Sequence, residues 1–378
     1  MKRSPQNKED LKDLAAKLDE QRNIIDAIDA DILQLIDRRL LAAQEIGRIK
    51  KRQHARVLDN QRELRIFQKL FGLSEHTRLS KTALYKIFSA IISASRVIQK
   101  PASEASADPR EAEIYAVLGH PVAHSLSPVM HSAAFSATGY DGVYLAVNVP
   151  DIGVALSGLK ALNFKGASIT IPHKIAVMEF IDEIDAQAEK IQAVNTVKNN
   201  DGRLFGCNTD CFGAISALSE KTVIKDKEVT MLGAGGAARA IGFGIRAAGG
   251  RLTIVNRSPQ KGSQLAGDLD ADFRPLAEVN KLDCHILINA TSVGMFPDND
   301  HVPLPQKFLD KKMVVMDIVY NPLKTKLLKW AETIGCATVD GVSMFVHQGA
   351  KQFEFWTGRK APVEIMKMTV LAALEERG

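Results

Sequence analysis

The sequence predicts a multidomain chain in which an all-α segment comes first and an α/β region follows. Between Leu11 and Gln99 there is no proline and only two glycines, and apolar residues recur at helical spacing. From Ile114 onward, short β-branched runs alternate with helical patterns, which indicates α/β units around a mainly parallel sheet. The 378 residues are also too many for one ordinary core.

In the first segment we expect helices at residues 11–50, 57–71 and 80–99, with Ser80 as the cap of the third. The first of these would be about 60 Å long at about 1.5 Å per residue, which exceeds the span of a small domain. Its apolar stripe, which includes Ile25, Ile28 and Ile32, must therefore pack against a larger partner. A second copy of the chain is the simplest candidate.

The composition is that of a globular protein without a nucleic-acid or membrane partner. A net charge of +5 gives no reason to expect nucleic acid, and no stretch has the roughly 18 consecutive apolar residues that span a bilayer. The first ten residues lack the apolar run of a signal peptide. The few cysteines form no CxxC pair, so we expect a cytoplasmic protein.

A glycine-rich turn follows the strand predicted at residues 229–232, and a helix follows the turn. This is the strand–turn–helix setting that a dinucleotide-binding G-x-G-x-x-A pattern requires. Glycines allow the backbone to approach a pyrophosphate, and the free N–H groups of the helix start can bind it. We therefore expect a Rossmann-type domain with these cofactor contacts: Gly233, Ala234, Gly235, Gly236 and Ala237.

The end of the next strand indicates which dinucleotide is bound. An NAD enzyme usually carries Asp or Glu there to hold the adenosine ribose. This sequence has Asn256, Arg257 and Ser258, with Lys261 shortly after. Cationic side chains attract a 2′-phosphate that a carboxylate would repel, so the sequence predicts NADP.

Four other segments place polar side chains in apolar surroundings: HSLSP at 124–128, SITIPHK at 168–174, QAVNT at 192–196 and GCNTD at 206–210. Ser127 followed by Pro128 also fits an ordinary helix start, with Ser127 as N-cap. That interpretation does not account for Ser125. Lys174 is expected at the start of a helix.

These segments resemble the shikimate dehydrogenase family over about residues 114–378. The resemblance implies a catalytic pair formed by Lys174 and Asp210. It also implies substrate contacts and further cofactor contacts, the latter in NATSVGM at 289–295. The substrate contacts are Ser125, Ser127, Thr170, Asn195, Tyr320 and Gln348, and the cofactor contacts are Asn289 and Thr291.

The reaction implied by the resemblance is the reversible reduction of 3-dehydroshikimate to shikimate with NADPH. A hydride reaches the carbonyl carbon and a proton must reach the oxygen, so Lys174 is expected to act as general acid and Asp210 to orient it. The positive dipole of a helix start would ease proton release from Lys174.

No metal site is expected near His120, His124 and His131. Pro121 prevents a regular helix from presenting the first two together, and no cysteine lies nearby in the sequence.

Charged residues in the helical segment are spaced to share faces. Arg39 and Lys50 are eleven residues apart, about three turns. Asp59, Arg62 and Glu63 fall at i, i+3 and i+4, and Ser95 and Gln99 at i and i+4. Several cations and hydroxyl-binding groups in a helical pocket suit a dianionic substrate.

This pattern resembles the all-helical chorismate mutase family over residues 15–100. The resemblance implies rearrangement of chorismate to prephenate in a homodimer of intertwined helical domains. The implied catalytic residues are Arg39, Lys50 and Gln99, and the implied substrate contacts are Arg22, Asp59, Arg62, Glu63 and Ser95.

The sequence therefore predicts four parts: a chorismate mutase domain at 1–100, a linker at 101–113, a shikimate-binding domain at 114–209 and 345–378, and an NADP-binding domain at 210–344. Two alternatives stay open. The helical domain could be a non-catalytic module for dimerisation or effector sensing, and the dehydrogenase could act on quinate.

Overall fold

The chain divides into two compact units, Met1–Glu111 and Ala112–Gly378. The computed structural model describes residues 6–52, 66, 69–70, 72, 77–79, 81–99 and 112–375. Most of the helix predicted at 57–71, the capping residue Ser80 and most of the predicted linker lie outside these residues.

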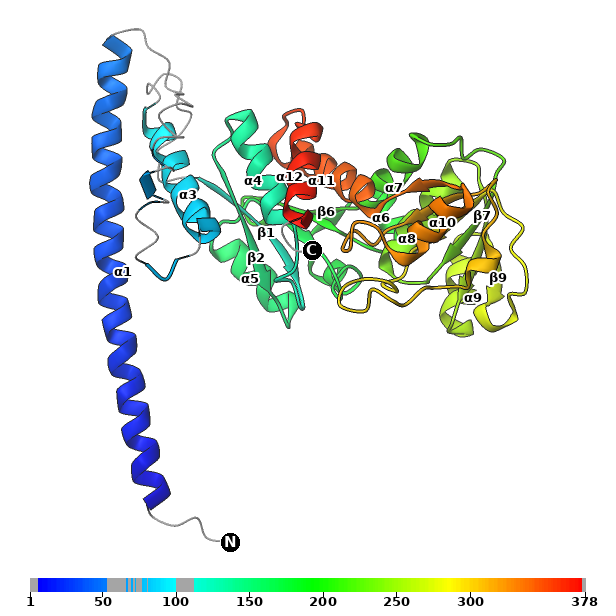
Figure 1. Ribbon diagram of the computed structural model, residues 1–378, viewed down its shortest axis with the longest axis horizontal. Helices are drawn as coiled ribbons and strands as arrows, with labels where there is room; N and C mark the ends of the chain where they lie inside the picture. The colour runs from blue at the N-terminus through cyan, green and yellow to red at the C-terminus, as the bar shows by residue number, and fades with distance from the viewer. Residues whose placement is uncertain are drawn as a thin grey trace. The chain divides into compact units, whose positions relative to one another are not determined.

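Two long helices make up most of the described part of the first unit, and they lie side by side (Figure 1). They are α1 (Gln6–Arg52) and α3 (Lys81–Gln99). Ala43, Leu84 and Ile92 are buried. α1 is much longer than α3, so many of its apolar side chains are exposed: Leu18, Ile24, Ile25, Ile28, Ile32, Leu33, Leu35, Leu41, Ile46 and Ile49. α1 extends beyond the predicted 11–50 at both ends.

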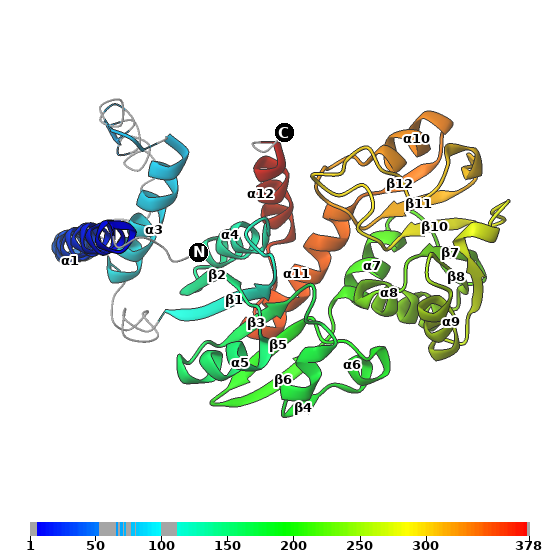
Figure 2. The same cartoon turned by 90° about the horizontal axis from the view of Figure 1, so that it is seen from below.

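The second unit contains two six-stranded sheets (Figure 2). One is parallel throughout, in the order β12-β11-β10-β7-β8-β9, which is the order of a dinucleotide-binding Rossmann sheet. Its strands are β7 (Glu228–Leu232), β8 (Arg251–Asn256), β9 (Asp272–Pro275), β10 (Ile286–Asn289), β11 (Val314–Asp317) and β12 (Ala337–Val339).

The other sheet is mixed, in the order β2-β1-β3-β5-β6-β4. Here β3 pairs antiparallel with β5, and β5 pairs antiparallel with β6. The strands are β1 (Glu113–Gly119), β2 (Gly142–Asn148), β3 (Gly166–Ile169), β4 (Glu183–Ile184), β5 (Thr196–Asn200) and β6 (Arg203–Cys207).

The β5–β6 hairpin is absent from the sequence prediction. Asp201 and Gly202 form its turn, and both have positive φ, 51° and 92°. This is the conformation that two-residue hairpins favour, and an Asp-Gly pair is its usual signal. β5 is polar in composition, so its sequence does not predict a strand. The side chain of Asn199 is nevertheless buried, and its Oδ1 accepts a hydrogen bond from the Gly202 N–H in the turn.

Helices cover both faces of each sheet, which explains why the central strands β3, β7, β10 and β11 are buried along almost their whole length. The mixed sheet packs on α4 (Ser127–Thr138), α5 (Ile152–Ala161), α11 (Gly341–Thr357) and α12 (Val363–Glu375). The parallel sheet packs on α7 (Asp210–Ser219), α8 (Gly236–Ala247), α9 (Pro259–Asp268) and α10 (Lys326–Ile334). The remaining short helices are α6 (Ala186–Ile191), η1 (Ala176–Phe180), η2 (Leu276–Glu278) and η3 (Gln306–Phe308).

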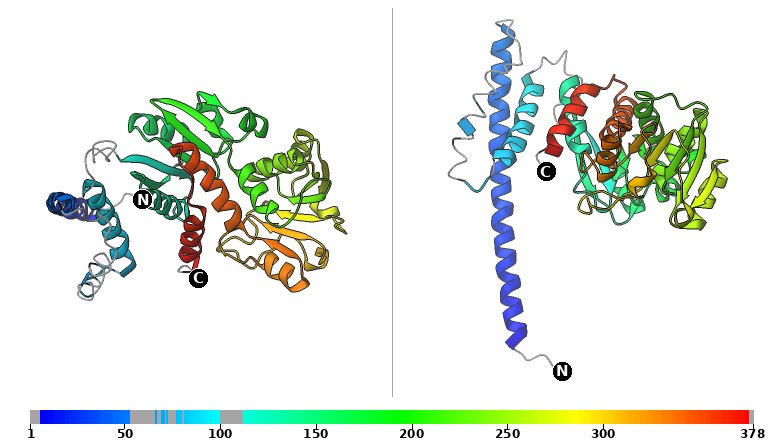
Figure 3. Two further views of the ribbon diagram at one scale, coloured as in Figure 1. Left: turned by 90° about the horizontal axis from the view of Figure 1, so that it is seen from above. Right: turned by 45° about the vertical axis from the view of Figure 1, so that its right-hand side comes forward.

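Two of these helices connect the two sheets. The chain leaves the mixed sheet through α7, which leads from β6 to β7, and returns through α11, which follows β12. The two pack against each other, and α11 runs between the sheets (Figure 3, left). Among the described residues, no helix combines the length and the apolar character needed to cross a membrane.

Candidate active sites

The predicted site of the second unit is built around an ion pair between side chains from two different elements. Lys174 lies in the turn after β3 and Asp210 is the first residue of α7, and Lys174 Nζ is 2.5 Å from Asp210 Oδ2. Both side chains are largely buried, at 16% and 6% exposure. The turn leads into η1, a five-residue 3-10 helix, so the prediction that Lys174 starts a helix with a useful dipole is wrong.

Asn195 fixes the other oxygen of the carboxylate. Its Nδ2 donates to Asp210 Oδ1 at 2.8 Å and to Thr209 Oγ1 at 3.0 Å, and its Oδ1 accepts from the Thr209 N–H. The Asp210 N–H donates to Asn208 Oδ1. With both oxygens bound, Asp210 can hold only one orientation toward Lys174.

A buried polar chain that the sequence analysis missed supports this pair. Gln352 donates to Thr196 Oγ1 at 2.9 Å and to the Asn195 carbonyl at 3.2 Å, and it accepts from Ser168 Oγ at 2.8 Å. Ser168 in turn bonds the Tyr144 hydroxyl. Gln352 lies one turn after Gln348, so the i, i+4 spacing on α11 was the available signal.

The two predicted serines lie where β1 leads into α4. Ser125 Oγ accepts from the Ser127 N–H at 3.2 Å. α4 begins at Ser127 and its N-cap is Leu126, so the prediction of Ser127 as N-cap is off by one position. Burial raises the pKa of the Tyr144 hydroxyl, and hydrogen bonds with Ser168 and Ser127 oppose that rise. Ser127 thereby joins the buried polar chain.

α11 gathers two more predicted substrate contacts. Gln348 donates to the Phe345 carbonyl, and its Oε1 is 3.5 Å from Asn195 Nδ2. The Tyr320 ring stacks on Phe345 with centroids 4.7 Å apart. Thr170 lies between β3 and Lys174, with its methyl group packed against Gly119.

The glycine loop lies beside the ion pair. Gly233 has a φ of +115°, and a Cβ there would approach the Ala290 carbonyl to 2.9 Å, so no other residue fits without strain. A Cβ on Gly236 would be 3.5 Å from Lys174 Cβ. No side chain caps the start of α8, which leaves its N–H groups for an anion.

The predicted 2′-phosphate contacts follow β8, the strand next to β7. Asn256 donates to the Ser258 carbonyl and shapes the turn before α9. Arg257 and Lys261 are exposed, and within the described part of the chain neither forms an ion pair. These two cations are therefore available to a ligand at this edge of the sheet.

Asn289 is fully buried and all its hydrogen bonds are internal. It donates to Asp317 Oδ1 and to the Val293 carbonyl, and it accepts from the N–H and the hydroxyl of Thr291. The pKa of Asp317 is raised to about 6, because burial raises it more than the hydrogen bonds from Thr325, Val319 and Asn289 lower it. The amide of Asn289 shapes the loop that follows β10, and Thr291 is the loop residue beside Gly233.

The three histidines have separate surroundings. His120 Nδ1 is 3.1 Å from Asn148 Oδ1, and His124 is exposed. His131 is fully buried and stacks on Tyr144 with centroids 4.5 Å apart. Burial lowers the pKa of His131 to about 3, and neither ring nitrogen has a hydrogen-bond partner among the described residues. His131 therefore serves as a neutral packing residue.

In the first unit, α1 and α3 bring together three predicted site residues. Arg39 Nη1 donates to Ser95 Oγ and, at 3.4 Å, to the Ile91 carbonyl. Burial lowers the pKa of Arg39. Gln99 packs against Gly47, and its Oε1 is buried with no hydrogen-bond partner among the described residues. A buried acceptor without a partner is costly unless a ligand satisfies it.

The other residues predicted for the site of this unit lie elsewhere on α1 or outside the described residues. Arg22 pairs with Asp19 at 3.1 Å on an exposed part of α1. Lys50 is half-buried on α1, one turn after Gly47. Asp59, Arg62 and Glu63 lie outside the described residues.

Three family models match the chain. Residues 117–197 match the shikimate dehydrogenase substrate binding domain, and residues 341–371 match the shikimate 5'-dehydrogenase C-terminal domain. Residues 21–100 match chorismate mutase type II.

Similar proteins cover nearly all of the second unit. Shikimate dehydrogenase (NADP(+)) of Moorella thermoacetica is 43% identical over an alignment of 275 residues, and the alignment covers 69% of this chain and 93% of that protein. Shikimate 5-dehydrogenase of Thermus thermophilus, solved with NADP(H) and shikimate, is 37% identical with a TM-score of 0.65, covering 69% of this chain and 100% of that one. A chorismate mutase/shikimate 5-dehydrogenase fusion protein of Clostridium acetobutylicum is 32% identical with a TM-score of 0.65, covering 71% of this chain and 98% of that one. This chain therefore belongs to the shikimate dehydrogenase family and carries a chorismate mutase type II domain ahead of its dehydrogenase part.

Proposed function

We propose that the chain is a bifunctional enzyme of aromatic biosynthesis that reversibly reduces 3-dehydroshikimate to shikimate with NADPH and rearranges chorismate to prephenate. The observation that carries the first activity is the Lys174–Asp210 ion pair, buried beside Gly236 of the glycine loop. A fixed ammonium next to a dinucleotide site suits reduction of a carbonyl group.

The cofactor is NADP, as in the relative from Moorella thermoacetica, and it supplies the hydride that reaches the carbonyl carbon. Lys174 gives a proton to the carbonyl oxygen as its bond to carbon becomes single, and recovers it when the alcohol is oxidised. Asp210 holds the ammonium at 2.5 Å and Asn195 fixes Asp210. Arg257 and Lys261 bind the 2′-phosphate.

The substrate is held on the mixed-sheet side. Ser125 and Ser127 bind its carboxylate, while Thr170, Asn195, Tyr320 and Gln348 bind its ring hydroxyls and carbonyl. Gln348 Oε1 lies 3.5 Å from Asn195 Nδ2, and this proximity supports a shared binding surface. Comparing the rates of shikimate and quinate oxidation tests this assignment, since quinate carries an additional hydroxyl on the carbon that bears the carboxylate.

The mutase activity rests on the cluster around Arg39. Its guanidinium donates to Ser95. Gln99, one turn after Ser95 on α3, offers an acceptor oxygen that has no partner among the described residues. Lys50 completes the catalytic group, and Arg22, Asp59, Arg62 and Glu63 complete the binding of the two carboxylates and the hydroxyl. An assay of residues 1–105 for conversion of chorismate to prephenate decides between this proposal and a non-catalytic helical module.

The helical domain makes a homodimer through α1. Its exposed isoleucines and leucines form a stripe far longer than α3 can cover, and contiguous apolar surface of this size marks an interface. The domains lie at 1–100, 114–209 with 345–378, and 210–344, with a linker at 101–113. All four cysteines are free, which supports a reducing compartment such as the cytoplasm.

A further inference from the structure

The buried polar chain described above runs inside the second unit from β2 to the start of α7. Its consecutive hydrogen bonds are 2.6–2.9 Å long, and each member is at most 6% exposed. In order, the members are Tyr144, Ser168, Gln352, Thr196, Asn195 and Asp210. The chain therefore ends on the carboxylate of the catalytic ion pair.

The Asp210 carboxylate sets the direction of the hydrogen bonds in this chain. A carboxylate only accepts, so Asn195 turns its Nδ2 toward Asp210. On the other side of the amide, Asn195 Oδ1 accepts from the Thr209 N–H, which only donates. The Asn195 amide therefore has one permitted orientation.

The same logic fixes the next two members. Because Asn195 Oδ1 only accepts, the Thr196 hydroxyl donates to it, and Thr196 Oγ1 accepts from Gln352 Nε2. Gln352 Nε2 also donates to the backbone carbonyl of Asn195, and Gln352 Oε1 accepts from Ser168. Position 352 thus requires two donors on one side and an acceptor on the other, which among side chains of this length only glutamine provides.

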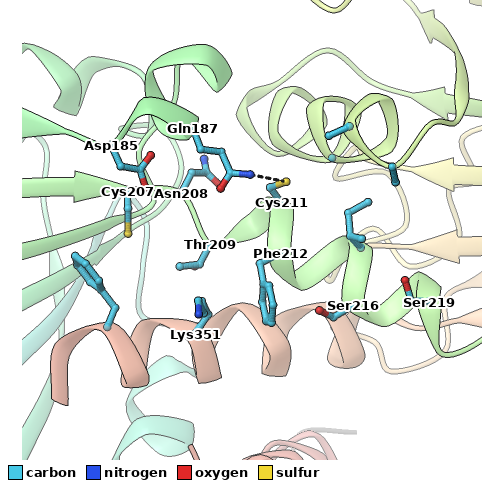
Figure 4. Close-up of a pocket in the computed structure, with 15 residues that line it drawn as sticks. Asp185, Gln187, Cys207, Asn208, Thr209, Cys211, Phe212, Ser216, Ser219 and Lys351 are labelled. Carbon is cyan, nitrogen blue, oxygen red and sulfur yellow. Dashed lines mark hydrogen bonds between the residues drawn. The ribbon is translucent and has the colours of Figure 1, made fainter. Parts of the chain in front are cut away.

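Asn195 is also held by Thr209, on the side of α7. Thr209 lines a cavity of about 620 Å³ beside α7 and α11 (Figure 4), which is large enough to hold water that hydrogen-bonds to the polar groups lining it. Gln352 does not line this cavity and is 1% exposed. Its hydrogen bonds to Asn195 and Thr196 are therefore shielded from water.

We propose that Gln352 is a positioning residue of the dehydrogenase: it keeps the amide of Asn195 turned toward Asp210 and thereby fixes the carboxylate that holds the general acid. Gln352 forms no hydrogen bond with either member of the ion pair and acts through Thr196 and the backbone of Asn195. Gln348, one turn earlier on α11 and a proposed substrate contact, approaches the same Asn195. This role of Gln352 rests on the dehydrogenase activity proposed above.

Gln352→Met keeps the length of the side chain and removes its hydrogen bonds. For shikimate oxidation by the full chain, kcat should fall about tenfold, the scale of one or two lost hydrogen bonds. The KM for NADP should stay unchanged, because Gln352 lies outside the predicted cofactor site. A purely structural role would instead lower the Tm and leave kcat per folded chain unchanged. Gln264→Met is the matched control, since Gln264 is an exposed glutamine on α9, and it should keep the wild-type kcat.

Gln352→Glu tests the direction of the chain. As a neutral acid, the new carboxyl group can accept from Ser168 and donate to Thr196. Once ionised it only accepts, and it takes the Thr196 proton away from Asn195. Burial raises the pKa of a carboxyl group, so the kcat of this variant relative to wild type should fall as pH rises from about 5 to about 9. The same ratio for Gln352→Met should stay constant.

Neighbouring titratable groups do not produce this signal. Burial lowers the pKa of His131 and raises that of Tyr144, so both side chains stay neutral over this range. Asp210 and Lys174 are present in the wild type and in both variants, so any effect of their ionisation cancels in the ratio.

Thr196 provides a second test of the same link. Thr196→Val keeps the shape and removes the hydroxyl, so it should lower kcat by a similar factor, and Thr196→Ser should recover most of that loss. If Gln352→Met does not fold, Gln352→Glu and the two Thr196 variants decide. Wild-type kcat in Gln352→Met, or a Gln352→Glu ratio that does not fall with pH, would each overturn the positioning role while the dehydrogenase activity stands. Absence of shikimate oxidation by the wild-type chain would overturn both.

Discussion

The ammonium of Lys174 lies 2.5 Å from the carboxylate of Asp210, although the two residues are 36 positions apart and belong to segments on either side of a hairpin. The turn after β3 supplies one partner and the start of α7 supplies the other. The pair is buried, and Asn195 holds the carboxylate from the opposite side.

Removing either partner should therefore stop the dehydrogenase without affecting the mutase. Lys174→Ala and Asp210→Ala should each lower kcat for shikimate oxidation by roughly 10²–10⁴, the usual scale for a positioned acid or base. Lys160→Ala is the control, because Lys160 forms a similar ion pair with Asp182 on the surface. Near-normal shikimate oxidation in both active-site variants would remove the pair from the mechanism.

Arg257→Ala should weaken NADP much more than NAD. The lost partner is the 2′-phosphate, and one charge-assisted contact corresponds to roughly ten- to a hundredfold in affinity. The KM of each cofactor measures the effect, and Arg203→Ala controls for removal of an exposed arginine elsewhere, since Arg203 pairs with Glu183 on the surface. Equal losses for both cofactors would give Arg257 a structural role.

The stability of the dehydrogenase unit should fall as pH decreases from about 6.5 toward 3 because of His131. Its folded pKa of about 3 is below the ordinary value of 6.5, so in this window the unfolded chain binds a proton that the folded chain excludes. Stability is present above pH 6.5 and declines by up to about 1.4 kcal/mol per pH unit below it. His131→Phe should remove this part of the slope.

Asp317 should act in the opposite direction. Its folded pKa of about 6 exceeds the ordinary value of 3.8, so the folded chain keeps a proton that the unfolded chain loses, and its contribution to stability declines as pH rises through about 4 to 6. Asp317→Asn should therefore steepen the net acid sensitivity. Urea unfolding followed by fluorescence measures both, since the two tryptophans, Trp330 and Trp356, lie in this unit. An unchanged pH profile in both variants would contradict these assignments.

Cleaving the chain within residues 101–113 should yield two separately folding, active pieces. The boundary between compact units falls at residue 111, and each side has its own apolar pattern. Purification of the two fragments followed by both activity assays checks this. An insoluble dehydrogenase fragment would show that it depends on the helical domain.

Mixing two inactive mutase variants should restore activity if the proposed dimer shares its sites. Arg22 precedes Arg39 by seventeen residues, which places it about 100° around the helix and about 25 Å along it. A two-fold dimer in which Arg22 of one chain completes the site of the other satisfies both constraints.

Arg22→Ala and Arg39→Ala should each be nearly inactive alone. Co-refolding them should recover up to about a quarter of wild-type activity, because one site of each mixed dimer then carries both defects and the other carries neither. Arg48→Ala is a suitable control on the same helix, since Arg48 forms an exposed pair with Glu45. If heterodimers form and activity does not return, Arg22 acts within its own chain or has no role.

Local signals predicted much of the fold. The glycine loop lies in the predicted strand–turn–helix setting. Four Rossmann strands, β7, β8, β10 and β11, were recognisable as apolar runs, whereas β9 and β12 were not. The β5–β6 hairpin was missed because β5 contains Lys198, Asn199 and Asn200, which have a low propensity for strands. In the folded chain, pairing with β3 and β6 outweighs this low propensity. Strand order and antiparallel pairing depend on contacts distant in sequence, which periodicity does not encode.

The candidate sites show the same division. Residues within short polar segments, such as Asn195 and Asp210, were identifiable. Gln352 was missed, because its spacing from Gln348 was the only local signal and its partners Ser168 and Thr196 lie more than 150 positions away. The helix expected at Lys174 failed because the chain makes a turn at residues 171–175 before η1. Burial of Asn289, with all its hydrogen bonds internal, likewise depends on the folded loop.

The chain crosses between its two sheets only through α7 and α11, within the described residues of the second unit. Asp210 begins one crossing and Gln348 lies in the other. A swing of the nucleotide-binding half about these helices would move the outer loops, such as that bearing Arg257, through the longest arc, while residues near the axis would move least. Cofactor exchange could then proceed by a wide opening at these outer loops, while Lys174 and Asp210 stay together near the axis.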